Sequence, residues 1–207
     1  MEKIKELFSL YKKFHIEIQK RKQGFLDVKK DKTLVLKELC FCLLTPQSKA
    51  TNCWQAVEIL FNNGFPKMTA AQVQSILKKY TRFYKTKTKW LTEAAKKFDI
   101  IWQLVNKNFE PVILREILVR EIKGMGYKEA SHFLRNIGYS FDLAIIDRHI
   151  LKNLLYYKVL SSIPKSINKN RYLELEQKFI KFSQDIKIPL VDLDLLFWAK
   201  QTGVVFK

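Results

Sequence analysis

Two glycines, a lysine and an aspartate in the second half of the chain have types and a spacing suited to chemistry on a nucleic acid. Gly124 and Gly126 are followed by Lys128, and Asp147 lies nineteen positions after that lysine. A glycine lets backbone N–H groups approach a phosphate, because no Cβ is in the way and a left-handed φ costs little. A lysine at the start of a helix can act as an amine nucleophile, because the helix dipole and partial burial disfavour its charged form. The pattern predicts covalent chemistry on DNA.

Helices on both sides must position these residues. Apolar residues recur at helical spacing over 112–122 and 127–137, and a hairpin from Lys123 to Gly126 joins the two segments. The hairpin opens on a helix N-terminus, where the dipole favours an anion such as a DNA phosphate. Asp147 is predicted to cap the next helix. Taken singly, a Gly-x-Gly turn, a solvated lysine and a capping aspartate are common structural features, so only the combination indicates catalysis.

The charge of the chain also favours a nucleic-acid partner. Lysine and arginine number 38 against 20 acidic residues among 207, a formal net charge of +18. Such an excess attracts a polyanion, because binding releases counterions from the nucleic acid, and the affinity falls steeply as the salt concentration rises. We find no apolar run of about eighteen residues, basic amphipathic anchor, lipidation motif or signal peptide. A membrane partner is therefore not expected, and a cytoplasmic, nucleoid-associated protein is.

The three cysteines carry little functional information. Cys40, Cys42 and Cys53 are unevenly spaced and lie in apolar helical surroundings. This placement is typical of reduced thiols in the core of a cytoplasmic protein. We therefore expect neither a metal site nor a cofactor.

The hydrophobic pattern predicts an all-α protein, folded as one domain or two closely joined lobes. Thr45 and Pro46 are expected to start a helix, as N-cap and first residue, and the charged segment 24–33 is expected to be a connection. Asn62 to Pro66 is a break, and 161–170 is the longest polar loop. Helices are predicted at 2–22, 34–44, 50–61, 70–80, 86–98, 99–106, 112–122, 127–137, 148–157, 170–184 and 190–200.

Together these motifs resemble the helix-hairpin-helix DNA glycosylase superfamily. The resemblance rests on Gly124-Met125-Gly126-Tyr127-Lys128 with the downstream Asp147, which stand where the superfamily has its G-h-G-x-K hairpin and aspartate. Asp147-Arg148-His149 looks like the D-x-H pattern of 8-oxoguanine glycosylases, and 43–47 resembles the early glutamine motif of endonuclease III relatives. The compact length and Asp194, Trp198 and Lys207 look most like the second, prokaryotic and archaeal-type class of 8-oxoguanine DNA glycosylase/AP lyases.

The resemblance implies two helical lobes that flank a DNA-binding cleft. Residues 36–140 would form a helical barrel lobe that carries the helix-hairpin-helix motif at 113–137, and residues 1–35 plus 141–207 would form the second lobe. A monomer acting on double-stranded DNA that contains oxidised guanine is expected. Unlike endonuclease III, the chain has no four-cysteine run near its C-terminus, so an iron–sulfur cluster is not expected.

The same resemblance assigns catalytic roles. Lys128 would attack C1′ of the flipped nucleotide, displace the base and leave a Schiff base that permits β-elimination. Asp147 would stabilise positive charge on the sugar and direct the amine. Gly124 and Gly126 would bind backbone phosphate.

Several further residues are candidates for DNA contact. Gln47, at an expected helix start, could enter the gap left by the flipped base, although a surface cap is an equal alternative. Arg82, Phe83 and Tyr84 could stack on a base or wedge the duplex, although core packing could claim one ring. Arg148 and His149 could bind phosphate, although a histidine on an apolar face more often has a structural partner.

Base recognition is assigned to the end of the chain. Asp194 and Trp198 are four apart on a predicted helix, so a carboxylate and an indole would share one face. Gly203 should end that helix and let Lys207 dock nearby; the alternative is a core tryptophan with a frayed terminus. Two other functions stay open: a non-catalytic helix-hairpin-helix DNA-binding module, and a glycosylase for another lesion, such as an oxidised pyrimidine or an alkylated base.

Overall fold

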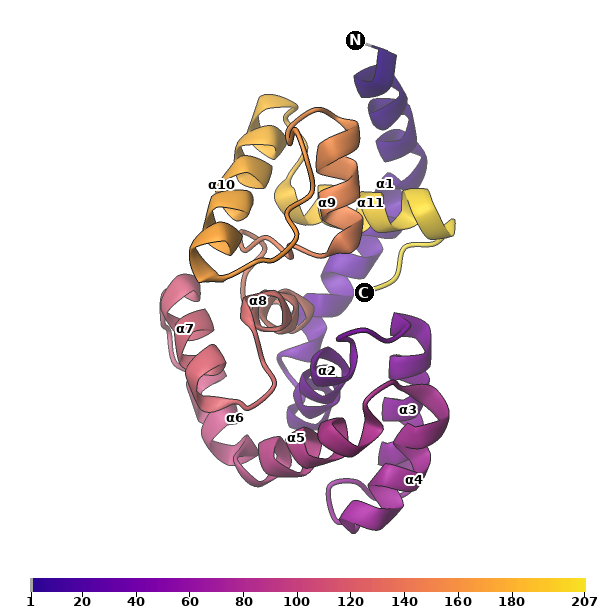
Figure 1. Ribbon diagram of the computed structural model, residues 1–207, viewed down its shortest axis with the longest axis vertical. Coiled ribbons are helices and arrows are strands. Elements are labelled where there is room, and N and C mark those ends of the chain that lie inside the picture. The colour runs from indigo at the N-terminus through magenta and orange to yellow at the C-terminus, as the bar shows by residue number, and fades with distance from the viewer. Residues whose placement is uncertain (1) are drawn as a thin grey trace. The chain divides into compact units, whose positions relative to one another are not determined.

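The computed structural model describes residues 2–207, and within them all regular structure is helical, which confirms the all-α prediction (Figure 1). The predicted helices are all present, with ends that differ by a few residues. They are α1 (Glu2–Val28), α2 (Lys32–Leu44), α3 (Ala50–Asn62), α4 (Ala70–Tyr80), α5 (Tyr84–Lys96), α6 (Phe98–Asn106), α7 (Pro111–Glu121), α8 (Tyr127–Asn136), α9 (Arg148–Tyr156), α10 (Lys169–Asp185) and α11 (Leu190–Thr202).

The chain forms two compact units. One consists of residues 28–133, and the other combines residues 2–27 with 134–207. The first unit begins and ends somewhat earlier in the chain than the predicted lobe of residues 36–140. Within residues 2–207 no helix is both long and apolar enough to cross a membrane.

Helix α2 forms the core of the unit made by residues 28–133. Its residues from Leu39 to Leu44 are all buried, and α3, α5 and α6 pack against it, while α4 packs on α3 and α5. A helix that is apolar on every side must be surrounded by other elements, because no face of it can be left in water. Asp31 fixes its start, since the carboxylate accepts from the backbone N–H of Thr33 at 2.7 Å and of Leu34 at 3.0 Å.

The helix-hairpin-helix motif is formed by α7, the turn 122–126 and α8, as predicted. Arg115 of α7 is buried, donates to the Ser131 hydroxyl of α8 at 3.1 Å and lies over the Tyr127 ring. In the turn, the N–H of Met125 donates to the carbonyl of Ile122 at 3.1 Å, and both side chains are buried. These contacts hold the two helices in one arrangement.

A buried carboxylate organises the other unit. Asp192 of α11 is 1% exposed and accepts from the Tyr11 hydroxyl at 2.6 Å and the Gln19 amide at 2.9 Å, while Lys22 pairs with it at 2.7 Å. All three partners belong to α1, so this cluster attaches α1 to α11. Burial, together with the neighbouring carboxylate, raises the pKa of the Tyr11 hydroxyl above its usual range.

An aromatic stack fills the core beside it. The Tyr157 ring stacks on Phe182 at 5.7 Å and on Phe197 at 5.6 Å, and Phe179 continues the stack at 6.0 Å from Phe197. These rings come from the end of α9, from α10 and from α11, so the stack joins three helices.

Two local predictions were wrong. The segment 24–33 is not a connection, because α1 continues through Gly24 to Val28 and buries Phe25. Tertiary packing of Phe25 outweighs the weak helical preference of a single glycine. Thr45 does not start a helix but ends α2: its N–H donates to the Phe41 carbonyl at 3.1 Å and its hydroxyl donates to Cys42 at 2.9 Å.

Gly124 is the hairpin position at which an added side chain would fit worst. Its φ is +85°, and an added Cβ would lie 2.3 Å from the Trp90 ring. We predict that Gly124→Ala lowers the free energy of unfolding by about 2–5 kcal/mol, since backbone strain and overpacking add. Chemical denaturation followed by circular dichroism measures this.

Gly64→Ala is the matched control, because Gly64 has a φ of +91° but open space around it. Its expected cost is about 1 kcal/mol, from strain alone. Equal costs at the two positions would show that the contact between Gly124 and Trp90 does not constrain the hairpin.

Candidate active site

Lys128 lies in the first turn of α8, as predicted, with its amine partly enclosed. Its side chain is 22% exposed, and Nζ donates to the Thr45 hydroxyl at 3.2 Å. The carboxylate of Glu129 lies 3.9 Å from the same nitrogen. An amine that is half enclosed and held by a neutral hydroxyl has a defined direction and is still accessible to a substrate.

The hairpin glycines differ in their roles. Gly124 has a left-handed φ, the conformation that costs a glycine little, whereas Gly126 does not. Gly126 instead occupies the N-cap position of α8, because its carbonyl accepts from the N–H of Ala130 at 2.9 Å. Its own N–H donates to the Glu129 carboxylate at 3.3 Å. This is the return half of a capping box, in which the side chain at the third helical position satisfies the cap residue.

Gln47 lies in a turn, not at a helix start, which corrects the prediction. Its φ is +53° and it is exposed, three residues before α3 begins at Ala50. Thr45 is the C-cap of α2, and Pro46 then prevents the helix from continuing. A left-handed φ at a residue other than glycine costs about 1–3 kcal/mol and persists only where the surroundings enforce it.

Arg82 and Phe83 form the turn between α4 and α5, as predicted, and Tyr84 is the first residue of α5. Phe83 is 54% exposed, so core packing does not claim its ring. Its φ is +57°, a second left-handed conformation at a residue other than glycine. The Arg82 guanidinium lies 5.5 Å from the centre of the Phe83 ring.

Lys87, which no sequence motif singles out, links these two turns. It is 1% exposed, and its ammonium donates to the carbonyls of Leu44 at 2.6 Å and Pro46 at 2.8 Å and to the Ser48 hydroxyl at 2.8 Å. Burial lowers the pKa of Lys87 to about 8, with the Cys53 thiol acting against the shift. One signal could have found it, because Lys87 falls on the buried stripe of α5 that continues through Leu91.

Asp147 caps α9, as predicted. Its carboxylate accepts from the N–H of Ile150 at 2.8 Å, and its backbone is extended. Arg148 is exposed, so its guanidinium is available to a phosphate. His149 has structural partners: its ring lies 5.0 Å from the Trp198 ring, and Nδ1 is hydrogen-bonded to the Gln201 side chain.

The predicted base-recognition residues lie on and after α11. The carboxylate of Asp194 accepts from Arg135 at 2.9 Å, so this acid is ion-paired. Trp198 lies between His149 and the ring of Phe206, whose centre is 6.3 Å away. Gly203 ends α11 with a φ of +79°, and residues 205–207, including Lys207, are half-buried. The chain end therefore packs back on α11.

The indole of Trp198 has an uncommon feature. Its Nε1 is buried and has no hydrogen-bond partner among residues 2–207. Buried N–H groups are rarely left unsatisfied, because each costs about 1–3 kcal/mol. A ligand acceptor would remove that cost.

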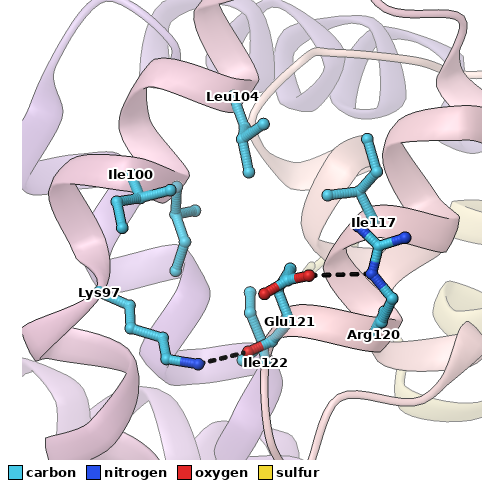
Figure 2. A pocket seen from close by; sticks show the side chains of 8 residues that line it. Lys97, Ile100, Leu104, Ile117, Arg120, Glu121 and Ile122 are labelled. Carbon is cyan, nitrogen blue, oxygen red and sulfur yellow. Dashed lines mark hydrogen bonds and ion pairs between the residues drawn. The ribbon is translucent and has the colours of Figure 1, made fainter.

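A pocket of about 280 Å³ lies between α6 and α7 (Figure 2). Its wall is mainly isoleucine and leucine. At its rim Lys97 donates to the Glu121 carbonyl at 3.1 Å and Arg120 pairs with the Glu121 carboxylate at 2.9 Å. None of the predicted site residues lines this pocket, so it is separate from the candidate active site.

Comparison with known proteins agrees with the geometry of the hairpin. The family model Ogg-HhH, described as 8-oxoguanine DNA glycosylase, matches residues 18–188. The chain belongs to this family. A relative in Fusobacterium nucleatum subsp. nucleatum, named 8-oxoguanine DNA glycosylase/AP lyase, is 38% identical over 98% of this chain and 96% of its own length. One in Methanocaldococcus jannaschii with the same name is 38% identical over 92% of this chain and 91% of its own.

Solved structures of this glycosylase family also resemble the chain. A crystal structure of the Methanocaldococcus jannaschii 8-oxoguanine glycosylase/lyase, in complex with a 15mer DNA containing 8-oxoguanine, has a TM-score of 0.91 and 35% identity. The match covers the whole of both chains. The all-helical architecture is therefore the glycosylase fold that the sequence motifs indicated.

Glu129 gives a test of phosphate binding by the hairpin. A phosphate on the Gly126 N–H must compete with the Glu129 carboxylate, which already accepts from that group. We predict that Glu129→Gln, which keeps the capping box and removes the charge, tightens binding to undamaged duplex by about two- to fivefold. This is the effect of roughly 0.3–1 kcal/mol for one charge at a helix N-terminus.

Fluorescence anisotropy at low salt measures this affinity. Glu110→Gln makes the same change in net charge at an exposed position at the other end of α7 from the hairpin, and serves as the control. If both variants bind equally well, the Gly126 amide does not contact phosphate.

Proposed function

We propose that this protein excises 8-oxoguanine from double-stranded DNA and then cleaves the strand at the resulting abasic site. The observation that carries the proposal is the Lys128 amine, held at the start of the hairpin helix by the Thr45 hydroxyl and still partly exposed. The proposal is supported by membership of the 8-oxoguanine DNA glycosylase family, whose model matches most of the chain. The relatives' names add the lyase activity.

The reaction begins with the damaged nucleotide outside the base stack, which costs a few kcal/mol. The neutral Lys128 amine attacks C1′, the bond from C1′ to N9 breaks, and the base leaves with that electron pair and takes up a proton. Opening of the sugar ring gives a Schiff base between Lys128 and C1′. Removal of a proton from C2′ then breaks the C3′–O bond, and the 3′ strand leaves as a phosphate ester.

Asp147 stabilises positive charge on the sugar while the base departs. Its carboxylate is fixed by the N–H of Ile150, so it needs no reorganisation as charge develops. Arg148, next to it and exposed, binds backbone phosphate.

Recognition of the oxidised base is assigned to Asp194, Trp198 and Lys207. Oxidation turns the N7 acceptor of guanine into an N–H donor and adds an oxygen at C8. The buried Nε1 of Trp198 can donate to an oxygen of the base, and the Asp194 carboxylate, with Arg135 on one oxygen, can accept from a base N–H. A normal guanine leaves such a site with an unmatched group, which is how hydrogen-bonding sites discriminate.

The first test traps the covalent intermediate with borohydride on duplexes that carry 8-oxoguanine, thymine glycol or an alkylated purine. Wild-type protein is expected to trap on the 8-oxoguanine duplex. Lys128→Gln should lower excision by roughly a thousandfold or more and abolish trapping, with DNA binding retained. Lys96→Gln is the control, because it removes the same charge from an exposed position on α5.

A Lys128→Gln variant that still traps would refute the lysine assignment. Preferred excision of thymine glycol or the alkylated purine would refute the substrate. Binding to every duplex without excision of any base would indicate that the protein is a non-catalytic DNA-binding module.

The second test separates the catalytic role of Asp147 from its capping role. Asparagine caps helices as well as aspartate does, so Asp147→Asn should unfold at the wild-type denaturant concentration. Excision should fall by about 100- to 1000-fold, because the charge that stabilises the transition state is lost. Single-turnover kinetics measure the loss. An unchanged rate would leave Asp147 with a capping role only.

A further inference from the structure

The buried Lys87 ammonium is fully hydrogen-bonded to one short segment of the chain. A buried charge is costly unless it is fully hydrogen-bonded, and an apolar side chain would fill the same place in α5 more cheaply. The ammonium has three N–H donors, and it has three acceptors at 2.6–2.8 Å: the carbonyls of Leu44 and Pro46 and the Ser48 hydroxyl. All three belong to the segment that ends α2 and contains Gln47.

These acceptors flank Gln47 on both sides in the chain. Pro46 precedes it and Ser48 follows it, and the residue between them has a φ of +53° and is exposed. Fixing the carbonyl before Gln47 and the hydroxyl after it leaves the turn little freedom. Lys87 therefore holds an exposed amide in a conformation that the residue would not adopt by itself.

The same contacts extend to the second strained turn. The Ser48 hydroxyl also accepts from the backbone N–H of Arg82, at 3.0 Å. The next residue, Phe83, has a φ of +57° and an exposed ring. One hydroxyl thus ties the Gln47 turn to the Phe83 turn, and Lys87 holds that hydroxyl. We call Lys87, its three acceptors and the Arg82 amide the Lys87 network.

We infer that Lys87 is a positioning residue, which holds Gln47 and Phe83 as one rigid pair that enters the duplex where the damaged base is flipped out. The inference rests on the proposed function and adds a role for a residue that does not touch DNA. An amide can hydrogen-bond to the base left unpaired, and an aromatic ring can fill the step between bases. A rigid pair is favoured, because mobile groups would lose conformational entropy when they enter the duplex.

The catalytic amine is held only in part by the Lys87 network: Thr45 lies between two of the Lys87 acceptors, but its hydroxyl is anchored one turn earlier in α2. Lys128 is held by the Thr45 hydroxyl, and that hydroxyl is anchored separately by donation to Cys42. Loss of Lys87 should therefore impair base extrusion more than the chemistry of Lys128. This separation provides the test.

The test compares Lys87→Met with Lys96→Met, which makes the same substitution at an exposed position of α5. Single-turnover excision of 8-oxoguanine by Lys87→Met should fall on the order of 100-fold, the scale of a displacement of about 1 Å in a positioned group. Lyase activity at a preformed abasic site, where no base has to be extruded, should change little. Lys96→Met should match wild type in both assays.

A spectroscopic readout follows the duplex directly. In the Lys128→Gln background, which cannot excise, 2-aminopurine next to the lesion should become fluorescent as its stack opens. Lys87→Met, Gln47→Ala and Phe83→Ala should each reduce that signal, and Lys87→Met combined with Gln47→Ala should lose little more than Lys87→Met alone. The same measurement on a duplex with an abasic analogue does not depend on which base the enzyme removes.

Three results would overturn the inference: equal excision by Lys87→Met and Lys96→Met, an unchanged fluorescence signal, or equal losses of excision and lyase activity, which indicate a general defect. If Lys87→Met does not fold, Ser48→Ala decides, because it removes only the hydroxyl shared by Lys87 and Arg82. A full signal from Ser48→Ala would overturn the inference. Wild-type protein that excises no 8-oxoguanine would refute the proposed function and leave the abasic-analogue measurement to decide the role of Lys87.

Discussion

The cost of burying a charge is the constraint on which both units of this protein depend. Removing one ion from water costs on the order of several kcal/mol, so each buried charge needs partners in fixed places. In the unit made by residues 28–133, Lys87 finds three oxygens; in the other unit, Asp192 finds a hydroxyl, an amide and an ammonium. Neither partner set can move without leaving a bare charge, so these contacts fix geometry as well as contribute stability.

The elements held in this way are those that carry the candidate site. Asp192 attaches α1 to α11, the helix that bears Asp194 and Trp198. Lys87 fixes the turns that display Gln47 and Phe83. In the hairpin, Arg115 reaches from α7 to Ser131 of α8, the helix that starts just before Lys128. Buried polar contacts thus support the groups that we propose to contact the substrate.

Two kinds of electrostatics serve different steps in the proposed function. The net charge of +18 gives an affinity for any DNA, which brings the protein to the duplex without regard to sequence or damage. Selection of one damaged base needs a few groups in exact register: the ion-paired carboxylate of Asp194 and the unsatisfied indole N–H of Trp198. We expect Glu129 to weaken the general affinity for DNA, because its carboxylate accepts from the Gly126 N–H at which we predict a phosphate to bind.

The sequence by itself determined the helical class, the hairpin, the Asp147 cap and the family. These features are local: helical periodicity, the G-h-G-x-K spacing and capping preferences all act within a few residues along the chain. Only the tertiary structure decided the geometry of Gln47 and the continuation of α1 through Gly24. Lys87 shows the reason most clearly, since it donates to Leu44 from 43 positions further along the chain. A sequence pattern can mark a lysine on an apolar stripe, but the oxygens that make its burial possible are chosen by the packing of α2 against α5.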